Sequence, residues 1–251
     1  MVELFPYLCC QASGGSCRWQ AFVGVYLKMK IIAHIENDYK EKFGIPRQSG
    51  LEEETLSKVV MEKEYGSMDA FHGLEEYSYI WLLWLFDVPE STEFQATVRP
   101  PRLGGNERRG VFATRSPFRP NSIGLTCVKL VSIQFESGTT KLCVQGADLK
   151  DGTRIIDIKP YLAYADARMD AGNGFAQDGL SHRLAVVYDE AQLSCIPESK
   201  RKGLLRALEL DPRPSYQEDP QRVYGMKYAA YNVRFRVEGN SLYIVQIDAM
   251  L

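Results

Sequence analysis

The 251-residue sequence lacks the signatures of several common chemistries. It has only three histidines and six cysteines, and no two cysteines form a C-x-x-C pair, so the spacing of a zinc site is absent and we expect no metal. It has no G-x-G-x-x-G motif, no Walker lysine motif and no G-x-S-x-G elbow. These absences argue against a Rossmann nucleotide site, a P-loop and an α/β-hydrolase nucleophile.

Long hydrophobic runs are also missing. The longest apolar run, Tyr79–Phe86, has eight residues, whereas a membrane-spanning helix needs about 20. The first 28 residues lack a basic segment followed by an apolar one, so we expect no signal peptide and a cytoplasmic protein with reduced thiols. Our hypothesis is that the functional protein begins near Met29 and that residues 1–28 are a poorly ordered tail or a mistaken start.

Charge is unevenly distributed along a chain whose net charge is −2. Residues 36–76 carry 11 acidic and 5 basic side chains, whereas residues 99–119 carry six arginines against one glutamate. A near-neutral protein with a concentrated basic tract fits local contacts with phosphates better than a general coating of nucleic acid.

The basic tract, Arg99–Gly124, contains four prolines and four glycines in addition to its arginines. Proline lacks an N–H and fixes φ, so this stretch cannot continue a helix. A flexible linker would be richer in serine and glycine than in arginine. We therefore predict a shaped loop that presents guanidinium groups to an anionic or carboxylate partner.

Short strands separated by turns dominate the first part of the chain. We expect strands at 30–35, 77–88, 124–135, 140–145 and 154–158, with 77–88 buried on both faces, and a short strand at 111–113. Residues 54–62 fit a strand or a helix, and 68–76 fit a helical turn with Asp69 as a cap. This pattern predicts a mainly β protein built on an antiparallel barrel, not a doubly wound sheet.

The composition of the sequence and its predicted elements change after the predicted barrel. We place the barrel domain at 29–167, a linker rich in Gly, Asp and Asn at 168–182, and a small α+β domain at 183–251. The small domain is predicted to contain a helix at 198–210 and a hairpin of strands at 231–237 and 241–248.

Four segments together resemble a known family: Arg99–Asn106, Gly110–Asn121, Ile123–Leu125 and Asp151–Tyr161. They look like the TsaA-like, or TrmO, family, and the resemblance covers residues 30–248. It implies a β-barrel enzyme with a small C-terminal domain, working as a homodimer. It also implies methyl transfer from S-adenosylmethionine to N6 of threonylcarbamoyladenosine, just 3′ of the anticodon (position 37), in threonine-accepting tRNA.

The resemblance also implies which residues bind the methyl donor. They are Pro46, Arg47, Gln48, Asp87, Arg115, Leu125, Asp148, Leu149, Lys150 and Asp151. Asp87 departs from the family, in which many members have a histidine. The departure keeps open the alternative of a module that binds S-adenosylmethionine or tRNA without turnover.

Each of these residues also has an ordinary structural explanation when it is taken alone. Arg115 could brace the loop against a carboxylate, Leu125 could belong to the core, and Asp151 could simply begin a turn with Gly152. Only their joint occurrence favours a binding site. No catalytic base can be assigned from the sequence. Asp151 and Asp157 are the candidates, and loss of the proton to water is the alternative.

The remaining arginines are candidates for contacts with tRNA phosphates. They are Arg99, Arg102, Arg108, Arg109 and Arg119 in the loop, and Arg213 and Arg222 in the small domain. Tyr216, Tyr224 and Tyr228 lie between charged residues and could either stack on bases or pack the small domain.

Overall fold

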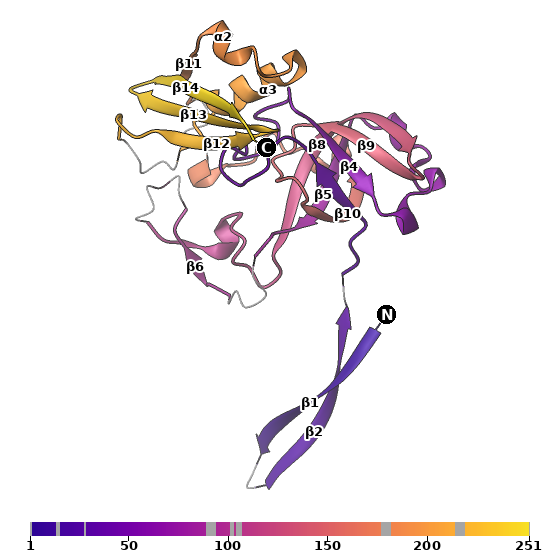
Figure 1. Ribbon diagram of the computed structural model, residues 1–251. Coiled ribbons are helices and arrows are strands. Elements are labelled where there is room, and N and C mark those ends of the chain that lie inside the picture. The colour runs from indigo at the N-terminus through magenta and orange to yellow at the C-terminus, as the bar shows by residue number, and fades with distance from the viewer. Residues whose placement is uncertain are drawn as a thin grey trace. The chain divides into compact units, whose positions relative to one another are not determined.

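The computed structural model describes residues 2–13, 16–27, 29–88, 94–100, 103, 107–176, 182–213 and 219–250. The chain forms two compact units, residues 1–31 and 32–251. The first unit is an antiparallel hairpin of β1 (Val2–Ser13) and β2 (Ser16–Leu27) (Figure 1). The sequence pattern predicts no strand there, and our hypothesis that residues 1–28 are a tail or a mistaken start stays a prediction.

A closed six-stranded barrel forms the first part of the second unit. Its strands are β3 (Ala33–Glu36), β4 (Leu56–Met61), β5 (Tyr79–Leu85), β8 (Ile123–Glu136), β9 (Thr139–Gln145) and β10 (Arg154–Pro160). They close in the order β10-β3-β4-β9-β8-β5, and every neighbouring pair is antiparallel (Figure 1). The predicted antiparallel barrel is confirmed.

The barrel core is built by period-two alternation along its strands. Ile80 and Leu82 of β5 face inward and are fully buried, whereas Tyr79 is 39% exposed and Trp81 is half-buried. The prediction that this strand is buried on both faces is therefore wrong, because only one face of a barrel strand meets the core. The β8–β9 hairpin is confirmed. Its two turn residues, Ser137 and Gly138, have positive φ, as a two-residue hairpin turn requires.

Short elements connect the barrel strands or follow β10, the last of them. They are the 3-10 turns η1 (Lys63–Tyr65), η2 (Met68–Phe71), η3 (Leu74–Glu76), η5 (Val111–Ala113) and η6 (Gly174–Ala176), the two-residue strands β6 (Thr97–Val98) and β7 (Arg109–Gly110), and α1 (Ala163–Asp166).

Two predictions about these short elements are wrong. Residues 111–113 form a 3-10 turn in place of a strand, because only Val111 is buried and no strand among the described residues pairs with this segment. Asp69 is not the cap of the turn at 68–71, because it lies inside the turn. The capping position is occupied by Ser67, whose side chain makes no capping hydrogen bond.

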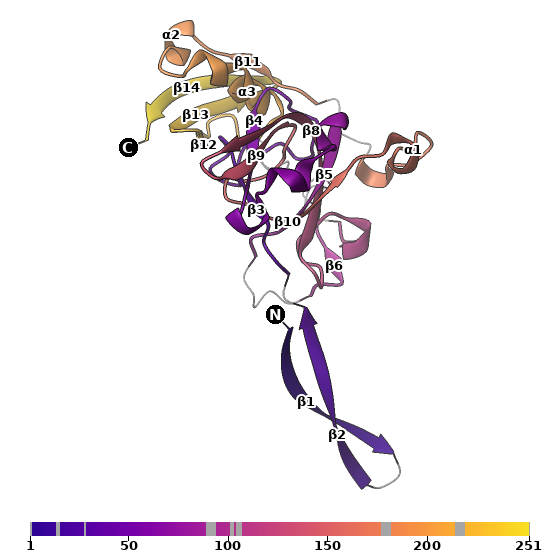
Figure 2. The ribbon, with the colours of Figure 1, turned by 90° about the vertical axis from the view of Figure 1, so that its right-hand side faces the viewer.

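The small C-terminal domain is a four-stranded sheet with helices over one face (Figure 2). Its elements are β11 (Ala185–Val187), α2 (Glu190–Leu193), α3 (Glu198–Glu209), β12 (Tyr224–Tyr228), β13 (Tyr231–Glu238) and β14 (Ser241–Ala249). The strand order is β11-β14-β13-β12, and β11 runs parallel to β14. The predicted helix and hairpin are confirmed, but the sequence pattern does not predict β11, α2 or β12.

A segment of the barrel domain is buried in the core of the C-terminal domain. Tyr39, just after β3, packs edge-on against Tyr228 of β12 with ring centroids 5.8 Å apart, and the two residues form a β-bridge. The Tyr39 hydroxyl donates to the buried Glu52 carboxylate at 2.8 Å, which also accepts the N–H of Thr55. Burial, and then the nearby Glu52 charge, raises the pKa of Tyr39, so this hydroxyl stays protonated as a donor.

The seam between the two domains, where α3 packs on Thr55 and Tyr228, predicts that replacing a helix glycine lowers stability. A Cβ at Gly203 of α3 would lie 2.4 Å from both Thr55 Oγ1 and Tyr228 Oη. These two buried hydroxyls lie 3.2 Å apart and hydrogen-bond each other, so neither can move without losing a partner. Gly203→Ala should therefore destabilise the fold by about 1–3 kcal/mol, opposite to the usual gain from removing a helix glycine.

Chemical denaturation measures this change. Gly172→Ala is the matched control, because nothing lies within 4 Å of its added Cβ. A Gly203→Ala variant as stable as the wild type would contradict the close packing of Gly203 against Thr55 and Tyr228.

Candidate functional site

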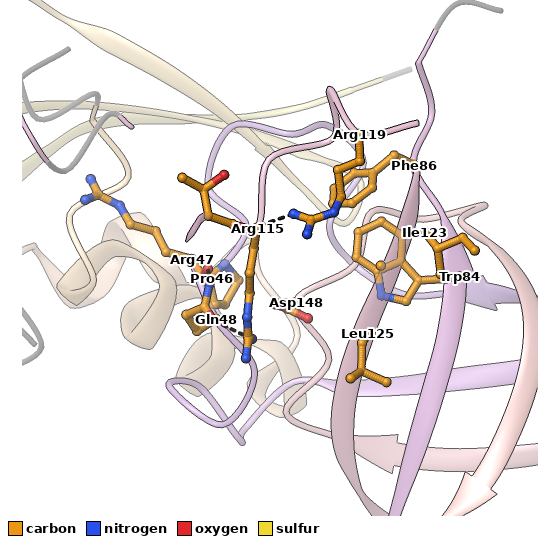
Figure 3. Close-up of a pocket in the computed structure, with 12 residues that line it drawn as sticks. Pro46, Arg47, Gln48, Trp84, Phe86, Arg115, Arg119, Ile123, Leu125 and Asp148 are labelled. Atoms are coloured by element: carbon orange, nitrogen blue, oxygen red, sulfur yellow. Dashed lines mark hydrogen bonds between the residues drawn. The ribbon is translucent and has the colours of Figure 1, made fainter. Parts of the chain in front are cut away.

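A cavity of about 360 Å³ opens where β5 ends and β8 begins (Figure 3). Strand ends and loops from four parts of the chain contribute to it. The lining residues are Pro46, Arg47, Gln48, Trp84, Phe86, Thr114, Arg115, Arg119, Ile123, Gly124, Leu125 and Asp148. The volume lies within the range of small-molecule sites.

One wall of the cavity is aromatic. The rings of Trp84 and Phe86 have centroids 4.3 Å apart, at an interplanar angle of 58°. Gly124 of β8 makes room for the indole, because a Cβ there would lie 2.2 Å from Trp84 Cε2. The wall thus offers a preformed apolar surface to a planar or apolar ligand group.

The indole is tied to the carboxylate in the lining by two hydrogen bonds. Trp84 Nε1 donates to Thr126 Oγ1 at 2.9 Å, and Thr126 Oγ1 donates to Asp148 Oδ1 at 2.8 Å. Burial raises the pKa of Asp148, and the bond from Thr126 and the positive charge of Arg115 partly oppose that rise. Asp148 is therefore a partly desolvated carboxylate whose orientation is fixed before any ligand arrives.

The opposite wall is cationic and polar. Arg115 Nη1 donates to Gln48 Oε1 at 2.8 Å, so this amide orients the guanidinium beside the cavity (Figure 3). Arg47 reaches into the C-terminal domain, where its Nη2 donates to the carbonyls of Asp211 at 3.3 Å and Arg213 at 2.8 Å. This loop therefore connects the cavity to the turn at 211–213.

The structure brings together six of the ten residues expected to bind the donor. Pro46, Arg47, Gln48, Arg115, Leu125 and Asp148 all line the cavity.

The other four, Asp87, Leu149, Lys150 and Asp151, lie beside the cavity and outside its lining. Asp87 pairs with Lys150 at 3.4 Å, and the Leu149 side chain belongs to the barrel core. Asp151 pairs with Lys40 at 2.9 Å and accepts the N–H of Asn37.

Asp157, the second candidate for a catalytic base, also lies outside the lining. Its carboxylate pairs with Lys159 at 2.8 Å and accepts the N–H of Ile158.

Most of the arginines expected to contact phosphates make contacts within the protein. Arg108 donates to Thr97 Oγ1 at 2.7 Å, and Arg109 pairs with Glu107 at 2.7 Å. Arg119 donates to the carbonyls of Val111 and Thr114 and lines the cavity.

In the C-terminal domain, both Arg213 nitrogens that face Asp211 bond its carboxylate at 2.9 Å. Arg222 is exposed and lies over the Tyr224 ring at 5.3 Å. Arg99 is exposed, and Arg102 lies outside the described residues.

Two of the three tyrosines considered for base stacking pack the small domain. Tyr224 is 6% exposed and Tyr228 is 1% exposed, so neither ring has a free face for a base. Tyr216 lies outside the described residues.

Sequence reasoning missed half of the cavity lining. The missed residues are Trp84, Phe86, Thr114, Ile123 and Gly124, together with Arg119, which was assigned to phosphate. The available signal was the position of Trp84 and Phe86 at the end of an apolar strand, next to the loops already selected.

Two family models match nearly the whole second unit. The tRNA-methyltransferase O N-terminal domain matches residues 34–167, and the TrmO C-terminal domain matches residues 183–250. The chain belongs to the TrmO family. The family resemblance predicted from the sequence motifs is therefore confirmed.

Named relatives agree with the family models. The chain is 39% identical over 214 residues to the tRNA (adenine(37)-N6)-methyltransferase of Escherichia coli (strain K12), covering 82% of this chain and 91% of that protein. It is 30% identical over 161 residues to a Pyrococcus abyssi protein named "Probable S-adenosyl-L-methionine-binding protein", covering 64% and 82%. The crystal structure of TrmO from Pseudomonas aeruginosa superposes with a TM-score of 0.71 at 30% identity, covering 90% of this chain and 100% of that one.

The cavity residues fit the methyl donor of such enzymes. S-adenosylmethionine presents an adenine, a ribose diol, a sulfonium, an amine and a carboxylate. An aromatic wall suits the adenine, a guanidinium suits the carboxylate, and a desolvated carboxylate suits a cation or a diol. Trp84 with Phe86, Arg115 and Asp148 supply these three groups around one cavity.

The described residues provide neither a membrane-spanning helix nor a cluster of metal ligands. None of their helices is long and apolar enough to cross a membrane. No group of three or more His, Cys, Asp and Glu side chains among them could hold a metal ion.

Asp148 predicts a conflict between stability and binding. Because the folded state raises its pKa, its ionised form opposes folding, and this cost is absent at pH values low enough to protonate the carboxyl in both states. Asp148→Asn should therefore increase the free energy of unfolding at neutral pH, and the gain should shrink as the pH falls through the raised pKa. The same substitution should weaken donor binding.

Denaturation at several pH values and calorimetric titration with S-adenosylmethionine measure the two effects. Asp157→Asn, outside the cavity lining, is the control for donor binding. An Asp148→Asn variant that loses stability at neutral pH would contradict the assigned environment.

Proposed function

We propose that the chain transfers a methyl group from S-adenosylmethionine to N6 of threonylcarbamoyladenosine at position 37 of threonine-accepting tRNA, in the cytoplasm. The observation that carries this proposal is the cavity in the barrel, which combines an aromatic wall, an oriented guanidinium and a desolvated carboxylate. The chain also belongs to a family of tRNA methyltransferases. The specific tRNA and its threonylcarbamoyl group come from the family resemblance.

The donor residues that we propose are those that the resemblance implies, together with Trp84 and Phe86 of the aromatic wall. The bound donor supplies an electrophilic methyl group on a sulfonium. Arg115, held by Gln48, binds the donor carboxylate, and Asp148, held by Thr126, faces its positive charge. Trp84 and Phe86 exclude water from the apolar wall, which strengthens both charge interactions.

Asp87, Leu149, Lys150 and Asp151 form a second layer in this proposal. Asn37 organises their segment, since its side chain donates to the Leu149 carbonyl at 2.8 Å and its N–H donates to Asp151. Substitution of the family's histidine by Asp87 leaves the cavity lining intact, because Asp87 lies outside it. The preference for an enzyme over a module that binds without turnover rests on the relatives, which are named tRNA methyltransferases.

The target nitrogen is a weak nucleophile, since its lone pair is delocalised into the adenine ring. Holding nitrogen, methyl carbon and sulfur in line is therefore the main contribution that the protein can make. Asp151 and Asp157 are engaged with lysines outside the lining, so we propose no side-chain base, and the proton of the methylated amine leaves to water.

A homodimer is part of the proposal. The outer face of β5 and β8 carries a strip of apolar side chains, including Tyr79 (39% exposed), Leu125 (49%) and Val131 (49%). Exposed apolar side chains gathered on one face fit a subunit interface, and the exposed Lys129, opposite Tyr79, lies between them. Leu125 belongs both to this strip and to the cavity lining, so a second copy packed there would border the donor site.

Methyl incorporation tests the proposed function. The chain is incubated with labelled S-adenosylmethionine and threonine-accepting tRNA, with and without the threonylcarbamoyl group. We expect label only in the modified tRNA, at N6 of the adenosine at position 37, identified by mass spectrometry of nucleosides. Arg115→Ala should abolish incorporation through loss of donor binding. Donor binding without any label would favour the binding module.

The dimer is tested by a charge placed on the apolar strip. Val131→Glu should convert the protein to a monomer, because a carboxylate buried in an apolar interface is poorly solvated. Light scattering measures the mass. Val245→Glu is the matched control, since Val245 is 45% exposed but belongs to β14 of the C-terminal domain. A wild-type chain that is monomeric would remove this part of the proposal.

A further inference from the structure

Two phenylalanines beside the cavity are exposed and stacked on each other. Phe112 is 70% exposed and Phe94 is 51% exposed, and their ring centroids lie 6.2 Å apart at an interplanar angle of 28°. Single exposed apolar residues are common on protein surfaces. A pair that is already organised as a stack is different, because its geometry suits an additional planar ring.

The backbone fixes Phe112 in its exposed position. In η5, Val111 is 1% exposed and anchors the turn, while the next residue points outward. Val111 N donates to the Ala96 carbonyl at 3.0 Å, and Thr114 Oγ1 donates to the Val111 carbonyl at 2.8 Å. Arg119 Nη1 adds bonds to the Val111 and Thr114 carbonyls at 3.2 and 2.6 Å. Four hydrogen bonds and the buried Val111 side chain thus hold this turn, from which the Phe112 ring projects.

The surroundings of the pair are cationic. The Arg119 guanidinium lies 5.5 Å from the Phe112 ring centroid. Arg109 belongs to β7 and pairs with Val98 of β6, a strand that begins three residues after Phe94, and Arg108 donates to Thr97 of the same strand. Among residues 99–119 the one acidic side chain, Glu107, pairs with Arg109.

We propose that Phe112, backed by Phe94, is a stacking platform for an unpaired nucleobase of the substrate RNA. This inference rests on the proposed function and adds a binding subsite to it. A ligand that combines flat rings with negative charge matches an exposed aromatic pair among arginines. A second copy of the chain also carries apolar and acidic side chains, but each nucleotide joins a planar ring to a phosphate, so RNA is the occupant that both features favour.

The position of the platform indicates which base it binds. Thr114 and Arg115, two and three residues after Phe112, line the donor cavity. The base on the platform is therefore a neighbour of the adenosine that enters the cavity. Holding the flanking base out of the anticodon-loop stack would also help to present the target base.

Binding of a fluorescently labelled anticodon stem-loop to the donor-free protein tests the platform. Stacking of one base on an aromatic side chain contributes about 1–3 kcal/mol, so Phe112→Ala should weaken binding by about five- to 160-fold. Phe112→Leu should weaken it similarly, since it keeps the apolar volume but removes the ring, and Phe112→Tyr should bind like the wild type. The affinity for S-adenosylmethionine should be unchanged in all three variants.

A fluorescent base analogue reports stacking on the platform directly. With 2-aminopurine next to the target adenosine, wild-type protein should quench its fluorescence by stacking, and Phe112→Leu should not. Phe135→Ala is the matched control, because Phe135 is 58% exposed but lies at the far end of β8. It should leave both RNA binding and quenching unchanged.

Three results would overturn the platform: RNA binding by Phe112→Leu equal to that of the wild type, a loss of dimer mass in Phe112→Ala, or no RNA binding by the wild type. The last result would also remove the proposed function. Wild-type protein that binds the RNA with ring-dependent quenching but transfers no methyl group would remove the proposed function alone.

Discussion

The burial of Tyr39 in the C-terminal domain is the constraint on which the geometry of the site depends. The ring comes from the chain just after β3 but packs among residues of β12 and β13, and its hydroxyl is satisfied by Glu52. Phe43 follows it into the same core and stacks near Tyr224 and Phe235. The loop that carries Arg47 and Gln48 is therefore anchored at its start. At its end it lines the cavity, where Gln48 orients Arg115.

The arginine-rich loop shows how a protein divides one residue type among different tasks. A guanidinium has five donors in a fixed plane, so it can hold backbone as well as bind anions. Arg119 braces a turn through two carbonyls, and Arg47, which lies outside this loop, does the same between domains. Arg115, whose partner is a neutral amide, keeps its charge available to a ligand. Sequence composition counts these side chains alike, and only their acceptors separate them.

The barrel was largely predictable because its determinants are local. Alternation along β8 and β9 and the turn at Ser137-Gly138 specify a hairpin from neighbouring residues alone. The strand β12 was missed although it pairs with the adjacent β13 across a two-residue turn and its burial alternates. The strand β11 was not predictable, because its partner β14 is distant in sequence. The same limit applies to the site. The motif residues Gln48 and Arg115 were found, whereas Trp84 looked like any core residue until Gly124 was seen to lie against its indole.

The β-bridge between Tyr39 and Tyr228 has a consequence for the order in which the protein matures. A ribosome releases the barrel strands well before it makes β12. Until then, the rings of Tyr39 and Phe43 have no core to enter, and the loop bearing Arg47 and Gln48 has no fixed anchor. The nascent barrel can close while its cavity remains unfinished. Anchoring of the cavity loop is thereby tied to synthesis of the domain that comes last.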